Sequence, residues 1–144
     1  MTDATHQDAI VLLELMEVSA LRGMPVPLAW LSGTEFDTQY SSFRHKCPPG
    51  SENFGHAMTI VQHFDSLGVL WKHALVDEDL AFDWAPVEAV WERIQGFVRG
   101  VREELHAPMF GAHFEMMARA VLGIEALGVE HKDRAQAGAS SLVQ

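Results

Sequence analysis

The chain has 144 residues, 48% of them hydrophobic and 21% charged, and a formal net charge of −10 at pH 7. This composition predicts one soluble globular domain with a sizeable core. The acidic balance, with no basic run longer than Arg44-His45-Lys46, disfavours nucleic acid and anionic membrane surfaces as partners. The single cysteine, Cys47, excludes an intramolecular disulfide and a multi-cysteine metal cluster. We expect no signal peptide and no membrane span, which favours a cytoplasmic protein.

Residues 5–22 have the pattern of a first long helix. Apolar residues recur at helical spacing over residues 10–21 and cover an unusually wide face. Thr5 followed by Asp8 is typical of a helix start, and Gly23 with the prolines after it ends the helix. A face this wide indicates either a central helix or one that also meets a partner chain.

Residues 24–50 are expected to be the irregular part of the chain. Residues 27–31 could form one helical turn, and Pro48-Pro49-Gly50 is a firm break. Thr34 can cap a short helix whose apolar residues are Phe36, Tyr40 and Phe43.

The rest of the chain predicts three more long helices and one short one. Their expected bounds are Ser51 or Asn53 to about Leu75, a short helix capped by Asp77-Glu78-Asp79, Asp83 or Ala85 to about Leu105 with Pro86 in the first turn, and Phe110 to about Leu127. Short connections favour antiparallel neighbours. We therefore predict an all-α fold, a small antiparallel bundle of about four main helices plus short ones. A single domain would cover residues 1–129, with a flexible tail over 130–144.

Four short motifs suggest a family. They are Val61–Leu70, Leu75–Leu80, Val90–Ile94 and His113–Met117. Over about residues 53–118 the chain resembles a bacterial helical family catalogued as domain of unknown function 4760. This chain has Ala74-Leu75 where that family tends to place a glycine before the acidic cap. The resemblance implies a helical fold and no particular activity.

Asp65 and Glu115 are the carboxylates most in need of partners, because each lies on or beside an apolar helix face. An unpaired buried charge costs on the order of several kcal/mol. We expect each to pair with Arg93 or Arg102 of the third long helix. The alternative is that the two carboxylates converge as a general acid/base pair or as metal ligands.

The histidines do not form a metal-binding pattern with these carboxylates. His63 with Asp65 and His113 with Glu115 are each two residues apart, and such residues point about 200° apart on a helix. Helical metal sites prefer spacings of three or four. The sequence therefore predicts no metal site and no cofactor, and a metal-dependent enzyme built on these four residues is the least favoured function.

The favoured hypothesis is a non-enzymatic helical module that acts by self-association, as a homodimer, or by binding a partner protein. The wide apolar face of the first helix, the four tryptophans and the lack of catalytic motifs support it. Trp30 and Trp84 lie beside prolines or turns and are the candidate interface residues.

The alternative is a small-molecule-binding or sensor domain with a pocket between helices. The candidate ligand-binding residues are Asp65, Trp71, Trp91, His113 and Glu115.

Overall fold

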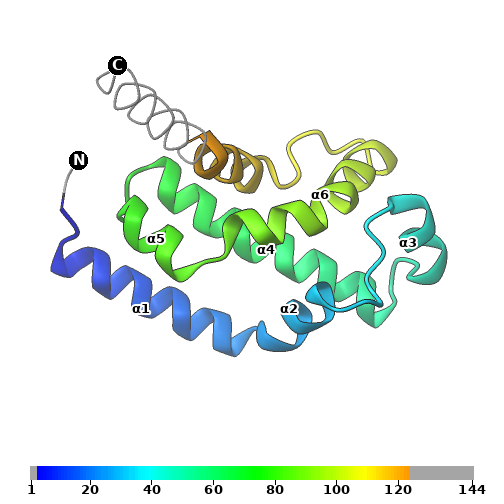
Figure 1. Cartoon of the computed structure of the whole chain (residues 1–144), viewed down its shortest axis with the longest axis horizontal. Coiled ribbons are helices and arrows are strands. Elements are labelled where there is room, and N and C mark those ends of the chain that lie inside the picture. Colours follow the sequence, from blue (N-terminus) through cyan, green and yellow to red (C-terminus); the bar gives the residue numbers. More distant parts are fainter. Residues whose placement is uncertain (1–2, 124–144) are drawn as a thin grey trace, which may run out of the picture.

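The computed structural model describes residues 3–123, and every regular element in that range is helical (Figure 1). The helices are α1 (His6–Leu21), α2 (Pro25–Ser32), α3 (Tyr40–Lys46), α4 (Glu52–Lys72), α5 (Glu78–Trp84) and α6 (Val87–Glu104), followed by a last helix over residues 112–123. The predicted all-α fold is confirmed. The predicted tail over 130–144 and the predicted end of the last helix near Leu127 lie outside the described residues.

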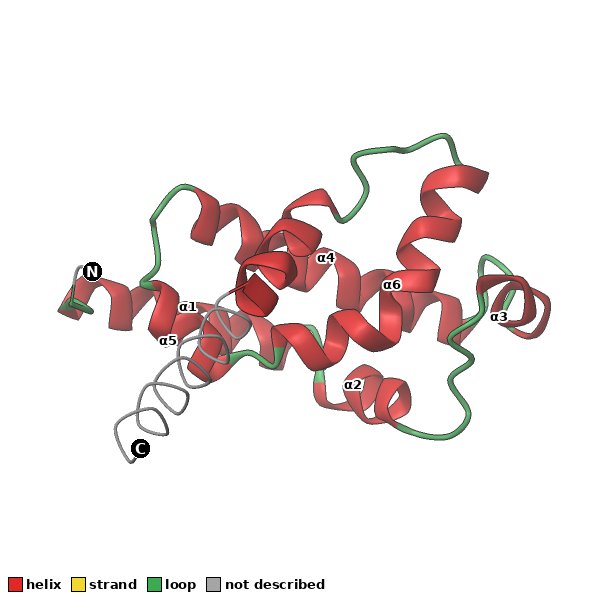
Figure 2. Ribbon diagram, turned by 45° about the horizontal axis from the view of Figure 1, so that its top comes forward, coloured by secondary structure: helices red, strands yellow, loops and turns green. Residues whose placement is uncertain are grey.

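Helices α4 and α6 form the centre of the molecule and run in opposite directions (Figures 1 and 2). Each buries one apolar stripe, as the helical spacing of their apolar residues predicts. α2 packs on both of them, α3 packs on α6, and α5 packs on α4. Leu105, expected at the end of the α6 stripe, is 60% exposed because α6 ends one residue earlier.

Side chains at the helix starts explain several of the boundaries. Thr5 and Asp8 form a capping box at α1, Ser51 caps α4 and Asp77 caps α5, each by accepting a backbone N–H of the first turn. These starts agree with the sequence pattern. Pro86 is the residue before α6 rather than part of its first turn.

The segment over residues 24–50 is more regular than predicted. α2 makes two turns rather than one, and its prolines lie at its start, where a missing N–H costs little. The short helix begins at Tyr40, not after Thr34 as predicted. Phe36 precedes that helix but is buried, with its ring 5.1 Å from that of Trp30.

A contact distant in sequence fixes this segment. Arg93 of α6 donates to the carbonyl oxygens of Leu31 and Gly33 at 2.8 Å each. It thereby satisfies acceptors that the end of α2 leaves free. A sequence pattern carries no sign of this contact, which explains why the segment looked irregular.

Helix α1 packs differently from the other long helices. None of its residues is fully buried, although the helix is rich in apolar side chains. It packs chiefly against α5, with Val11 and Leu15 turned toward the core. Figure 1 shows it along one edge of the molecule, with α5 on its inner side. The expectation of a central helix is therefore wrong, and the partner-chain alternative remains a prediction. No helix within residues 3–123 has the length and apolar character to span a membrane.

Candidate functional site

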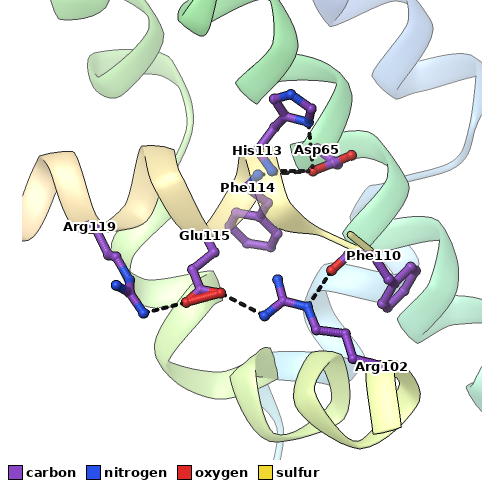
Figure 3. Close-up of polar contacts among 7 residues, drawn as sticks. All are labelled: Asp65, Arg102, Phe110, His113, Phe114, Glu115 and Arg119. Carbon is purple, nitrogen blue, oxygen red and sulfur yellow. Dashed lines mark hydrogen bonds and ion pairs between the residues drawn. The ribbon is translucent and has the colours of Figure 1, made fainter. Parts of the chain in front are cut away.

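Asp65 of α4 caps the last helix from outside (Figure 3). One of its carboxylate oxygens accepts the backbone N–H groups of His113 and Phe114, at 3.0 Å each. These are the groups that an N-cap side chain normally satisfies. The residue in the N-cap position is Gly111, whose carbonyl accepts the first helical bond, from Glu115, and which has no side chain to contribute. The predicted pairing of Asp65 with Arg93 or Arg102 is therefore wrong.

Two glycines allow α4 and the last helix to approach this closely. A Cβ atom at Gly68 would lie 2.6 Å from the carbonyl oxygen of His113. Gly111 has a φ of +65°, and a Cβ there would lie 3.2 Å from methyl groups of both Val61 and Val98. Larger residues at either position would move the helix away from Asp65.

Phe114 is a buried aromatic residue at the junction between α4 and the start of the last helix. Its ring is fully buried, stacks on Phe64 at 5.0 Å and meets Trp91 edge-on at 5.1 Å. Asp65 thus fixes the start of the helix that carries a central core residue. The motif Val61–Leu70 contains Phe64, Asp65 and Gly68, and all three contact this junction.

Glu115 lies on the other side of the last helix from Asp65 (Figure 3). Its carboxylate binds Arg102 and Arg119, with N–O distances of 2.7 Å each. Burial acts to raise the pKa of Glu115, but the two arginines outweigh burial and hold the pKa below its ordinary value. The predicted pairing of Glu115 with Arg102 is confirmed. Asp65 and Glu115 do not converge, because Asp65 binds the backbone at the start of the last helix while Glu115 faces Arg102 and Arg119 (Figure 3).

His113 and His63 have different surroundings. Nδ1 of His113 lies 3.9 Å from the Asp65 carboxylate. His63 is buried on α4 and lies 3.3 Å from Arg22, the residue that ends α1, so that its neutral Nδ1 accepts a hydrogen bond. Burial first, and then the charge of Arg22, lower the pKa of His63. Within residues 3–123 no three His, Cys, Asp or Glu side chains are grouped as a metal site would require.

The tryptophans nominated from the sequence are dispersed through the structure. Trp91 is buried in the core beside Phe114. Trp71 is half-buried, and its indole Nε1 donates to Glu78 at 3.0 Å. The five candidate ligand residues therefore belong to the core, to a helix cap, to an ion pair and to the α4–α5 corner, and do not surround one pocket.

Trp71 does border a cleft of about 640 Å³ between the start of α1 and the start of α5. The other polar residues of this cleft are mostly carboxylates, including Asp8 and Asp77. Both of these cap helices, Asp8 by accepting from Thr5 and Asp77 by accepting from the N–H of Leu80. Their positions are explained by the helix starts that they stabilise.

The candidate interface residues Trp30 and Trp84 are both half-buried. Trp30 has its ring within about 6 Å of those of Phe36, Phe43 and His56, and Trp84 lies 6.2 Å from the ring of His63. Each indole therefore has partners within the chain.

Among the helices of residues 3–123, α1 carries the largest number of exposed large apolar residues. We call the outward side of this helix the α1 surface; its exposed large apolar residues are Ile10, Leu13, Met16 and Leu21. Leu13 is 64% exposed and Leu21 82%. On the other side of α1, a groove of about 410 Å³ lies between Val18 and the leucines Leu70 and Leu75. Apolar residues gathered on one helix are typical of an interaction surface, whereas scattered ones are ordinary.

Sequence reasoning missed the cap that Asp65 supplies, although a signal for it exists. Residues 107–111 lead directly into the last helix and contain no Ser, Thr, Asp or Asn. A helix start without a cap residue of its own indicates that another element supplies the acceptor.

The chain was also compared with known proteins. The sequence profile of one family, described as "Domain of unknown function (DUF4760)", matches residues 4–121. This match extends beyond the 53–118 stretch that the motifs indicate, and it includes α1. No curated protein and no solved structure matches.

Proposed function

The chain belongs to the DUF4760 family, whose function is unknown, and we propose that it is a non-enzymatic interaction module that self-associates through the α1 surface. The single observation that carries the proposal is that α1 is rich in apolar residues and yet has no buried residue. A second copy of the chain is the occupant that we propose for this surface.

Covering this surface would contribute a favourable free energy to association. Completely burying one leucine or isoleucine side chain stabilises by about 1.5–3 kcal/mol relative to exposure. Leu13 and Leu21 are mostly exposed, and Ile10 and Met16 are 39% and 45% exposed. Partial burial of these side chains on both copies gives several kcal/mol, against which the loss of translational and rotational freedom must be set.

The nominated polar residues support a module that is not an enzyme. Asp65 caps a helix, Glu115 binds two arginines and His63 accepts a bond from Arg22. Each of these groups has a structural partner, and the three lie at separate places in the fold. A sensor pocket would need several of the nominated residues to face one cavity, and they do not do so.

Sedimentation equilibrium with paired variants tests this proposal. Leu13→Glu places a charge on the α1 surface, and Leu105→Glu places the same charge on a comparably exposed leucine, 60% against 64%, at the far end of α6. We expect the wild type and Leu105→Glu to dimerise between about 1 and about 500 µM, and Leu13→Glu to remain monomeric. A wild type that stays monomeric throughout, or a Leu13→Glu variant that dimerises as well as the wild type, would overturn the proposal.

A further inference from the structure

We infer that the second copy binds with its own α1, antiparallel, so that the two helices pack along one uncharged stripe. This inference rests on the proposed self-association and specifies which element of the partner is bound, and in which register. We define the stripe as Ala9, Leu13, Met16 and Ala20.

The stripe follows from helix geometry. With 3.6 residues per turn, positions 9, 13, 16 and 20 fall within about 60° of one another around α1. Leu13, Met16 and Ala20 are exposed, and Ala9 is half-exposed. Glu17 flanks the stripe and the other charged residues of α1 lie further round the helix, so the stripe presents no charge of its own.

The order of residue sizes along the stripe is symmetric. It reads small, large, large, small, and its midpoint falls between residues 14 and 15. An antiparallel pair related by a two-fold axis at this midpoint sets Ala9 against the partner's Ala20, and Leu13 against the partner's Met16. An interface between two copies of one chain must match itself in this way under the two-fold operation. Alanines at both ends also allow the helix axes to approach to about 8 Å.

The helix dipoles favour the antiparallel arrangement over the parallel one. A parallel pair would set Asp8 against the partner's Asp8 and align the two helix dipoles. In the antiparallel register the same carboxylates are offset by about 20 Å along the axis, because thirteen residues of 1.5 Å rise separate the facing positions.

The size of the interface sets its strength. A 16-residue helix is about 24 Å long and, with side chains, about 10 Å wide, so its footprint is about 240 Å² on each copy. This area places the contact in the small class typical of transient complexes, below about 1,200 Å² in total. The dimer is therefore weak and reversible.

Disulfide trapping tests the register. Cys47 is the sole cysteine, so Cys47→Ser gives a background without thiols. Ala9→Cys and Ala20→Cys are then made separately in that background and oxidised alone and as an equal mixture. A disulfide needs the two Cβ atoms within about 4.5 Å. In the proposed register residue 9 lies that close to the partner's residue 20, whereas the two copies of residue 9 are about 16 Å apart.

We expect a cross-linked dimer only in the mixture of the two variants. Cross-linking of either variant with itself would indicate a parallel or shifted pair and would overturn this inference. An uncross-linked mixture whose proteins still dimerise by sedimentation would also overturn it, while leaving the proposed self-association intact. Proteins that sediment as monomers would overturn both.

Discussion

Replacing Asp65 tests the account of how the last helix is held. Asp65→Ala removes the acceptor of two backbone N–H groups, those of His113 and Phe114. Phe114 is fully buried, so its N–H is left without a partner, which costs about 1–3 kcal/mol. The N–H of His113 lies closer to solvent and can be satisfied by water. Removing a carboxylate from a helix start costs about 0.3–1 kcal/mol more.

Together these terms predict a loss of about 1–4 kcal/mol in the free energy of unfolding for Asp65→Ala. At about 3 °C per kcal/mol for a domain of this size, Tm should fall by about 3–12 °C. Asp65→Asn keeps a neutral acceptor oxygen and should lose about 1 kcal/mol. The assay is urea unfolding followed by circular dichroism, at a concentration where the protein is monomeric.

Asp83→Ala is the matched control, because Asp83 is an exposed aspartate of α5. Surface substitutions of this kind change stability by about 0.5 kcal/mol or less. If Asp65→Ala were no more destabilising than Asp83→Ala, the cap supplied by Asp65 would be energetically unimportant and the reasoning would be refuted.

Three further predictions concern packing, pH and salt. Gly68→Ala should lower the free energy of unfolding by about 1–3 kcal/mol, because its Cβ would meet the His113 carbonyl. Gly55→Ala in the same helix has open space around it and should raise the free energy of unfolding by up to about 1 kcal/mol. Equal effects of the two substitutions in urea unfolding would contradict the close approach of α4 and the last helix. Because burial and the Arg22 charge lower the pKa of His63, the unfolded chain binds a proton before the native chain as the pH falls below about 6.5. Stability should therefore decrease from about pH 7 to about pH 5 more steeply in the wild type than in His63→Gln, and parallel pH profiles would argue against this role. Raising NaCl from about 0.05 to about 0.5 M should strengthen dimerisation, because salt screens the repulsion between two chains that each carry a charge of −10. Weaker association at high salt, measured by sedimentation, would count against an apolar interface.

The helices encoded by local patterns could be predicted from the sequence. α4 and α6 carry apolar residues at helical spacing, and Ser51 and Asp77 cap helices where the sequence places them. These features depend on neighbours along the chain, so a single sequence contains them. That Glu115 pairs with an arginine of α6 was also predictable, because a poorly solvated carboxylate requires a cation, but the choice of Arg102 over Arg93 was not.

Features that depend on distant contacts could not be read in this way. The end of α2 is completed by Arg93, and the last helix begins where Asp65 provides its cap. The sequence shows that the apolar face of α1 is unusually wide. The position of α1 at the edge of the molecule, however, depends on how much of the core the other helices fill. Apolar width alone does not distinguish a central helix from one that presents its side chains to a partner.

The central claim is that the α1 surface joins two copies of the chain, and sedimentation velocity across a concentration series measures this most directly. We expect a single reversible transition from the 16.0 kDa chain to twice that mass as the concentration rises from about 1 to about 500 µM. Leu13→Glu should abolish the transition and Leu105→Glu should leave it unchanged. A wild-type protein that sediments as a 16.0 kDa monomer at every concentration would contradict the account.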